Sequence, residues 1–376
     1  MASVERILIV GGGIAGLTLG AALHQRSFSA ELIERSASWE AIGAGIAVQA
    51  NGLRALDALG LASLVERAGT VLSRWGFCDQ QGELLCEIDL EALWKGVGPC
   101  IGIERPKLQR VLLAGAAPIP MRLSTSIISL TQKTTQCVLV GFSDGSTGEY
   151  DLVVGADGIS SSVRALTLSD APPVYTGAMA WRSIAPIRPQ GLTTLKFLLG
   201  DGCFFGLCPV GEGHTYGFGN ATMPRFHEPL DRRLGRLRNR FAAFGGLVQE
   251  YLAALESDEQ IHCAPVEWLE LDEWLVGRVI LIGDAAHASS PMMGQGGCMA
   301  MEDAVVLAEV LHSAPTVESA LGAYVARRRP RVNWVQRESS AVAEGFRLPT
   351  AVRNAALRER GDEMHRYRFR PLIPTP

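Results

Sequence analysis

The sequence lacks any apolar run long enough to cross a membrane, since none approaches about 18 consecutive apolar residues. A strand-like segment begins at about Glu5 with no charged and apolar leader before it, so we expect a cytoplasmic protein without stable membrane insertion. A strong charge of one sign is also absent, because 35 Lys and Arg against 39 Asp and Glu give a net charge of -4. We therefore predict no nucleic acid partner.

The eight cysteines include no C-x-x-C pair and show no ordered spacing with histidines. This pattern predicts no metal site and no disulfide framework. One basic cluster, Arg327-Arg-Arg-Pro-Arg331, stands out in an otherwise acidic chain. Since a single short cluster is a poor track for phosphates, we interpret it as a solvated helix end that is broken at Pro330. With 376 residues, 47% hydrophobic residues and 41 glycines, the chain suggests an α/β protein of about two domains.

A dinucleotide fingerprint lies at the N-terminus, between an apolar strand and a helical pattern. In it, Gly11 allows a tight turn, Gly13 a close approach to a pyrophosphate, and Gly16 helix–strand packing. Glu34, where the next strand ends, lies 23 positions after Gly11 and suits a ribose hydroxyl, with Arg35 beside it. The motif predicts an adenine dinucleotide and does not separate FAD from NAD.

A second motif follows four apolar β-formers and brings Asp284 to the end of a buried parallel strand, where ligands bind. Next come a loop with Pro291 and a turn containing Gly294, Gly296 and Gly297, which opens an apolar-periodic helix. Without Cβ atoms, these glycines let the helix N-terminus approach a flat anionic ligand closely, and the helix dipole favours its charge. The pattern indicates half of a flavin site.

A third motif places Asp157 and Gly158 after another buried strand, ahead of Ser161-Ser-Val-Arg164. An acid in this position suits a phosphate-bearing ligand, and the same carboxylate could cap the following helix, since the two roles are compatible.

The order Gly-Asp-Ala-Ala-His from Gly283, then Pro291, Gly-Gln-Gly from Gly294 and Glu302-Asp303 resembles the second FAD motif of class A flavoprotein monooxygenases. The third motif resembles theirs as well, and the chain resembles enzymes of the urate hydroxylase, hydroxybenzoate 6-hydroxylase and salicylate hydroxylase type. The resemblance implies that FAD is the cofactor, that Asp284 binds its ribityl chain, and that Asp157 serves both FAD and the pyridine nucleotide. No second strand-linked fingerprint appears, so NADH or NADPH would bind transiently as co-substrate, with O2.

The same resemblance implies that the loop from Gly43 to Ile46, with Gly45, covers the flavin. It implies too that Arg105, at a helix start, reaches toward FAD, with Gln109 on the same helix; a plain surface arginine is the alternative. His287 would belong to the FAD-binding loop and need not touch substrate.

The expected fold is α/β, a Rossmann-like FAD-binding domain of the glutathione reductase type with an inserted α+β substrate domain and C-terminal helices. A helical stretch is expected within the insertion, from Asp231 to Leu255. The expected division is a discontinuous FAD-binding domain (1–70, 98–171 and 266–345), a substrate-binding domain (71–97 and 172–265) and a C-terminal helical segment (346–376). The active site should lie where the inserted sheet faces the flavin.

The family chemistry implied is hydroxylation of an electron-rich ring through a flavin C4a-hydroperoxide, for which the protein supplies a dry pocket and oriented dipoles. Backbone groups around Pro291, Gly294, Gln295 and Gly296 are the strongest catalytic candidates. Tyr216 could orient or deprotonate a phenol, or could simply pack in the sheet.

The expected substrate-contacting side chains are Tyr216, Phe204, Met292 and Trp181, although the last three could equally be plain core. Urate hydroxylases carry an arginine and an acid where this chain has Phe204 and Met292, which argues against urate and favours a largely apolar small-molecule substrate. Alternatives left open are an epoxidase or Baeyer-Villiger-type flavin monooxygenase, an FAD reductase, and an accessory flavoprotein. A monomer or homodimer is expected.

Overall fold

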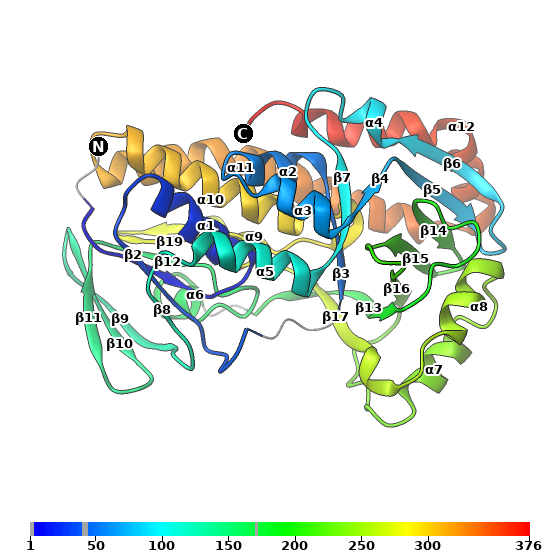
Figure 1. Ribbon diagram of the computed structural model, residues 1–376, viewed down its shortest axis with the longest axis horizontal. Coiled ribbons are helices and arrows are strands. Elements are labelled where there is room, and N and C mark those ends of the chain that lie inside the picture. The colour runs from blue at the N-terminus through cyan, green and yellow to red at the C-terminus, as the bar shows by residue number, and fades with distance from the viewer. Residues whose placement is uncertain (1–3, 40–43, 170–171) are drawn as a thin grey trace.

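The computed structural model describes residues 4–39, 44–169 and 172–376. Gly43, which belongs to the expected flavin-covering loop, lies outside these ranges. The protein is mixed α/β and elongated: a parallel sheet with helices fills one end and a second sheet the other (Figure 1). This architecture confirms the fold class predicted from the sequence.

A six-stranded sheet forms the core of the first part, in the order β18-β19-β12-β1-β2-β8. The strands are β1 (Ile7–Val10), β2 (Ala30–Ile33), β8 (Met121–Arg122), β12 (Leu152–Gly155), β18 (Leu275–Val276) and β19 (Val279–Leu281). β1 pairs in parallel with β2 and β12, and β12 pairs in parallel with β19. Because parallel strands end at one edge, the three sequence motifs meet there although they are far apart in the chain.

Helices and smaller sheets surround this core. α1 (Ile14–Gln25) packs between α5 (Arg105–Ala116) and α10 (Gly296–Ser313), as the apolar faces of their sequences require. The other elements of this part are α2 (Ala50–Asp57), α3 (Ala62–Ala68), α6 (Ser162–Thr167) and α9 (Asp284–His287), the sheet of β3 (Gly45–Val48), β7 (Cys100–Glu104) and β4 (Thr70–Leu72), and that of β9 (Ile127–Thr134), β10 (Cys137–Phe142) and β11 (Thr147–Tyr150).

The second sheet has seven strands in the order β17-β13-β16-β15-β14-β5-β6. They are β5 (Arg74–Asp79), β6 (Leu84–Asp89), β13 (Val174–Ala185), β14 (Leu195–Leu199), β15 (Cys203–Pro209), β16 (Thr215–Thr222) and β17 (His262–Trp268). One face packs on α7 (Arg233–Arg240) and α8 (Gly246–Ala253), and the other faces the rest of the molecule. The helical stretch expected from Asp231 to Leu255 is therefore two short helices, with a break after Arg240.

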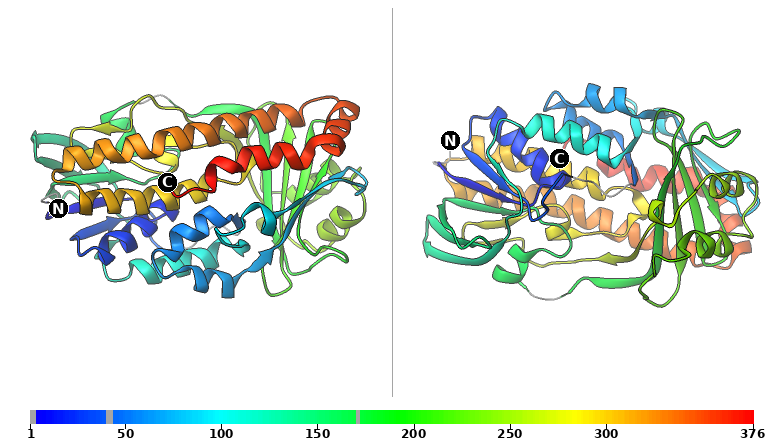
Figure 2. Two further views of the ribbon diagram at one scale, coloured as in Figure 1. Left: turned by 90° about the horizontal axis from the view of Figure 1, so that it is seen from above. Right: turned by 60° about the horizontal axis from the view of Figure 1, so that its bottom comes forward.

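Two long helices, α11 (Val317–Phe346) and α12 (Thr350–Phe369), close the chain, and α11 runs from the parallel-sheet end to the second sheet (Figure 2). The prediction of a solvated helix end broken at Pro330 is wrong, because Pro330 lies inside α11. Arg328 and Arg331 on either side of it are 0% and 9% exposed and bind buried carboxylates. These tertiary ion pairs hold the helix together where the local proline rule predicts its end.

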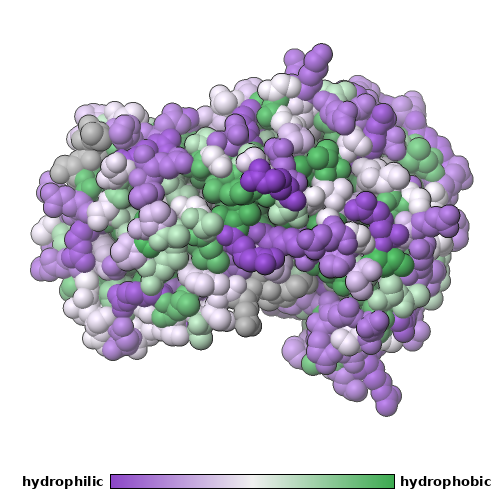
Figure 3. Space-filling model, viewed as in Figure 1, coloured by the Kyte–Doolittle hydropathy of each residue, from purple (hydrophilic) through white to green (hydrophobic). Residues whose placement is uncertain are grey.

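Within the described ranges, no helix is long and apolar enough to cross a membrane. The face drawn in Figure 3 accordingly mixes hydrophilic and hydrophobic areas. The same residues contain no group of three or more His, Cys, Asp and Glu side chains placed to hold a metal ion.

Candidate cofactor and substrate site

A large cavity of about 720 Å³ lies between the carboxyl edge of the parallel sheet and one face of the second sheet. Its volume falls within the range typical of cofactor and ligand pockets. Residues of all three sequence motifs line it on one side, and aromatic side chains of the second sheet line it on the other. The cavity therefore stands where the two main sheets face each other.

The N-terminal glycines do three different jobs. Gly11 has a φ of +108°, and a Cβ there would lie 2.5 Å from the carbonyl oxygen of Ala156. A Cβ on Gly16 would lie 1.9 Å from the carbonyl oxygen of Gly11, so this glycine permits close helix–strand packing away from the cavity. A Cβ on Gly13 would meet no protein atom within 4 Å. Gly13 thus presents bare backbone to the cavity, as a pyrophosphate requires.

Glu34 is positioned by two backbone amides. Its Oε2 accepts a hydrogen bond from the Gly12 nitrogen and its Oε1 one from the Ser36 nitrogen, both at 2.8 Å. A carboxylate has about four acceptor positions, so the group keeps capacity for a ligand hydroxyl. Arg35 lines the cavity next to it and is exposed.

Asp157 combines the two roles considered for it. Its Oδ2 accepts hydrogen bonds from the nitrogens of Ser162 (2.7 Å) and Val163 (3.2 Å) at the start of α6. Its Oδ1 is buried without a partner among the described residues, although Asp157 and Gly158 both line the cavity. An unpaired buried carboxylate oxygen is unfavourable, so it fits a donor from a bound ligand.

Asp284 begins α9 directly after Gly283, whose φ of +60° makes the sharp turn from strand to helix. The residue lines the cavity and is exposed there, while the rest of its surroundings is protein. Burial raises its pKa, and this effect exceeds the lowering by His287 and Arg105. A hydroxyl-rich ligand would satisfy this carboxyl group.

The N-terminus of α10 approaches the cavity through glycine backbone. Gly294 is in the left-handed region, with a φ of +62°, and a Cβ on Gly297 would lie 3.0 Å from Ile46. Pro291, Gly294, Gly296 and Gly297 all line the cavity. The free amides of a long helix point there, where its dipole favours negative charge.

Gln295, expected at the catalytic centre, does not line the cavity, because its side chain turns inward. Its Nε2 donates to Oδ1 of Asn51 (3.1 Å), and Asn51 Nδ2 in turn donates to Glu302 (3.0 Å). Gln295 is 1% exposed, so it ties the glycine turn to α2.

Behind this turn lies an ionic network that the sequence analysis missed. Arg328 bridges Glu302 (2.6 Å) and Asp303 (2.7 Å), and Arg331 also binds Glu302 (2.7 Å). Despite burial, Arg328 and Arg331 hold the pKa of the Glu302 carboxyl group below the usual range, and His287 and Arg328 do the same for Asp303. Asp303 further accepts from the Gly283 amide (2.9 Å). The network therefore fixes the Asp284 turn to α10 and α11.

Two further buried side chains support the turns at the cavity edge: His287 in α9 and Arg164 in α6. His287 Nε2 lies 2.6 Å from Asp303 Oδ2, and His287, at the end of α9, is not among the residues that line the cavity. Arg164, quoted in the third motif but not proposed as a site residue, donates to the carbonyl oxygen of Ala285 (3.0 Å). Its chain position in the Ser-x-Val-Arg pattern was the available signal.

Tyr216 packs against β3, the strand that carries Gly45. A Cβ on Gly45 would lie 2.4 Å from the Tyr216 side chain, and the Tyr216 and Phe218 rings stack at 5.0 Å. Burial raises the pKa of the Tyr216 phenol, with Arg182 and Arg105 opposing it. Tyr216 and both arginines line the cavity, so the phenol stands protonated beside two cations.

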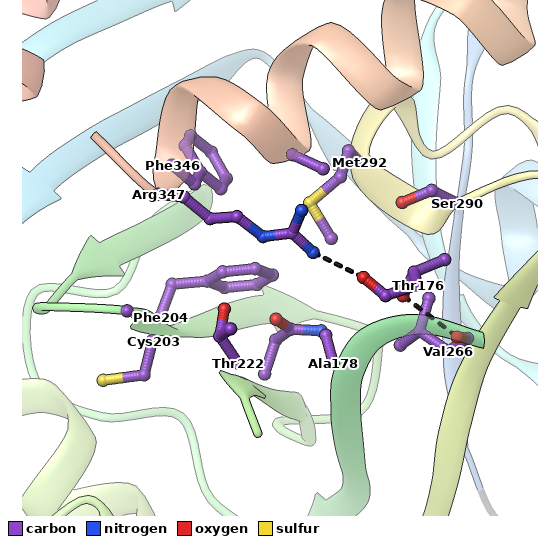
Figure 4. A pocket seen from close by; sticks show the side chains of 13 residues that line it. Thr176, Ala178, Cys203, Phe204, Thr222, Val266, Ser290, Met292, Phe346 and Arg347 are labelled. Carbon is purple, nitrogen blue, oxygen red and sulfur yellow. Dashed lines mark hydrogen bonds between the residues drawn. The ribbon is translucent and has the colours of Figure 1, made fainter. Parts of the chain in front are cut away.

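Four residues expected to contact the substrate or the cofactor do not line the large cavity. Trp181 is buried on the opposite face of the second sheet, where its Nε1 donates to Glu228 (3.2 Å). Successive strand residues point to opposite faces, so the neighbouring Arg182 lines the cavity instead. Gln109 is absent from the lining as well. Phe204 and Met292 line a separate, smaller cavity (Figure 4).

The geometry defines a flavoprotein: bare backbone at Gly13, the unpaired Asp157 oxygen and the glycine-lined helix N-terminus fit FAD. The chain matches the FAD binding domain family over residues 5–339. It is 33% identical over 346 residues to the aurachin C monooxygenase/isomerase of Stigmatella aurantiaca, covering 91% of this chain and 88% of that protein. It is 31% identical over 344 residues to the FAD-dependent urate hydroxylase of Klebsiella pneumoniae subsp. pneumoniae, covering 87% and 86%.

Among solved structures, Klebsiella pneumoniae HpxO complexed with FAD and uric acid superposes with a TM-score of 0.91. The two chains share 28% identity, with 99% of this chain and 97% of that chain covered. The protein belongs to the FAD binding domain family and, within it, to the class A FAD-dependent aromatic monooxygenases. Its cofactor is FAD, and the reductase, accessory and epoxidase alternatives are not favoured.

Proposed function

We propose that the protein consumes NADH or NADPH and O2 to hydroxylate an aromatic, electron-rich and largely apolar small molecule. The observation that carries this proposal is the wall opposite the cofactor edge. There the second sheet presents four aromatic rings to the large cavity, those of Trp75, Phe197, Tyr216 and Phe218. Aromatic walls bind planar apolar rings well, and the wall faces the side where the flavin ring would lie.

Under this proposal, the two expected domains have different roles, one in cofactor binding and the other in substrate binding. The FAD-binding domain (1–70, 98–171 and 266–345) holds the cofactor through Gly11, Gly13, Glu34, Arg35, Arg105, Asp157 and Asp284. The substrate-binding domain (71–97 and 172–265) excludes water and orients the ring, with Tyr216 donating a hydrogen bond to a substrate oxygen. Bound FAD would supply the electron transfer and oxygen activation. The backbone amides from Gly294 to Gly297 would stabilise negative charge developing nearby.

Urate is not the substrate under this proposal. Phe204 and Met292 are 5% and 7% exposed, and both belong to the apolar core, so at these two positions the chain offers urate no charged side chain. The relatives named for urate and for aurachin C are similar over most of the chain, which leaves the substrate to be decided by such side chains.

The test is O2 uptake and NADH or NADPH consumption by the purified FAD-loaded protein, with hydrogen peroxide assayed in parallel. We expect a phenol, indole or quinolone to accelerate consumption at least about tenfold while little peroxide forms, and urate to do neither. Stoichiometric peroxide with every compound, or efficient turnover of urate, would contradict the proposal.

A further inference from the structure

A small cavity lies beside the large one, between β13, β15, β16, the turn at Met292 and the end of α11 (Figure 4). Its volume of about 30 Å³ is room for about two water molecules. Val266 lines both cavities, and Phe204 of the small one stacks on Phe197 of the large one at 5.3 Å. The small cavity is therefore the immediate neighbour of the proposed substrate wall.

The small cavity has apolar walls and one unsatisfied buried donor. Ala178, Phe204, Val266 and Met292 supply much of the apolar surface. Asn220 also lines it and is 8% exposed, and its Nδ2 has no hydrogen-bond partner among the described residues. A buried amide donor without a partner is unfavourable, so a ligand oxygen that accepts from it would be bound favourably.

Arg347, an exposed residue at the rim of the same cavity, brings a positive charge to it. The Arg347 guanidinium points into the space between Met292, Phe204 and Thr176, and donates to the Thr176 carbonyl oxygen (Figure 4). It makes no ion pair within the ranges that the structure describes, and none of the lining residues is acidic. An unpaired cation with a nearby amide donor matches a carboxylate better than any neutral group.

We propose that this cavity is a subsite for a carboxylate on a short side chain of the aromatic substrate, bound by Arg347 and Asn220. The inference rests on the proposed function, since the ring would lie in the large cavity. The side chain would pass Phe204 and Met292, whose apolar surfaces suit its methylene group. The volume admits a slim substituent, and the substrate is thus an apolar ring with an acidic tip.

The test uses three phenols of nearly equal shape on the FAD-loaded protein: 4-hydroxyphenylacetate, 4-hydroxyphenylacetamide and 4-isobutylphenol. Binding is followed by the change in flavin absorbance. We expect Arg347→Gln to weaken the binding of 4-hydroxyphenylacetate about tenfold and the binding of 4-isobutylphenol less than about twofold. Asn220→Ala should weaken the binding of 4-hydroxyphenylacetate and of 4-hydroxyphenylacetamide about fivefold and leave the binding of 4-isobutylphenol unchanged. Arg358→Gln, which removes an exposed arginine paired with Glu83 on the surface, is the matched control and should change nothing.

A charge reversal separates recognition from damage to the fold. The Arg347→Glu variant should no longer bind 4-hydroxyphenylacetate and should gain affinity for tyramine, which carries an ammonium group in place of the carboxylate. A misfolded variant would instead fail to bind all four compounds and FAD. Equal losses for all phenols in Arg347→Gln would overturn the inference. So would neutral phenols that bind and accelerate NADH or NADPH consumption while the carboxylate does not bind, a result that leaves the proposed function standing. Arg347-dependent binding of the carboxylate without turnover of any aromatic would support the subsite and count against the proposed function.

Discussion

The two sides of the large cavity are built by different means. The cofactor side consists of glycine backbone and single carboxylates at the ends of parallel strands, held from behind by the Glu302, Asp303, Arg328 and Arg331 network. The substrate side consists of side chains on one face of a mostly antiparallel sheet. Backbone geometry and buried charge pairs tolerate few changes, whereas side chains on a sheet can change without moving it. The difference explains how one cofactor site can serve many substrates.

The largest expected effect follows from removing a buried cation on the cofactor side. Arg328→Met would leave Glu302 and Asp303 short of a partner, and should lower the free energy of unfolding by about 3–5 kcal/mol and release FAD. The control is its half-buried neighbour in Arg327→Met, which breaks an ion pair with Glu309 and a hydrogen bond to the Pro376 carbonyl oxygen and should cost about 1 kcal/mol. Urea unfolding and retained FAD measure both. Equal effects for the two arginines would show that burial does not distinguish them.

Two glycines test whether cofactor binding depends on the backbone itself. Gly16→Ala forces a Cβ against the Gly11 carbonyl oxygen, so it should lower the melting temperature of the FAD-free protein. It should also weaken the affinity for FAD by about a hundredfold, or about 2.7 kcal/mol. Gly13→Ala meets no protein atom and should leave that melting temperature unchanged, yet weaken FAD about tenfold. FAD titration and thermal melting separate the two. A Gly13→Ala protein with normal FAD affinity would contradict close approach of the ligand at this position.

The sequence predicts the cofactor side well because its signals are local. Gly11, Gly13, Asp157 and Asp284 stand in strand–turn–helix motifs, whose geometry follows from a few adjacent residues. The contacts that the sequence analysis did not predict are long-range. Arg328 binds carboxylates 25 and 26 residues away, across a helix–helix contact. A local rule therefore treats it as one of a solvated cluster.

The substrate side escaped for a related reason. The face on which Trp181 or Arg182 points depends on strand register, and shifting by one residue exchanges the two. That register is fixed by pairing β13 with β16 and β17, which lie far along the chain. Likewise, the separation of Phe204 and Met292 from the large cavity depends on where α11 ends.

The two sides should also respond differently to acid. His365 packs on Trp75 and Phe77 of the second sheet, and burial lowers its pKa to about 4. In the unfolded chain a histidine has a pKa near 6.5, so the unfolded chain binds more protons than the folded protein between pH 6.5 and pH 4. The contribution of neutral His365 to the free energy of unfolding is therefore complete above pH 6.5 and is lost as the pH falls toward 4. At pH 5 the loss should be about 2 kcal/mol. The pKa of Glu302 is lowered, so the cofactor side should weaken only below the usual carboxyl range.

Urea unfolding at pH 7 and pH 5 measures this pH dependence, which is called the slope below: the fall in the free energy of unfolding between the two pH values. His365→Phe, which keeps an aromatic ring among its neighbours, should remove most of it, while His227→Phe at an exposed position should keep it. A smaller slope should remain in His365→Phe, because burial lowers the pKa of His262 as well. An unchanged slope in His365→Phe would place the acid sensitivity elsewhere.

The smallest expected effects come from two neighbours on β13 that point to opposite faces. Trp181→Phe removes a buried hydrogen bond to Glu228 under α7, and should lower the free energy of unfolding by about 1–2 kcal/mol with KM within about twofold. Arg182→Gln changes the cavity wall, and should raise KM about fivefold with an unchanged melting temperature. Steady-state kinetics and thermal melting of both variants give the comparison. If Trp181→Phe raised KM and Arg182→Gln lowered the melting temperature, Trp181 rather than Arg182 would face the cavity, and the assignment of Arg182 to the cavity wall would be wrong.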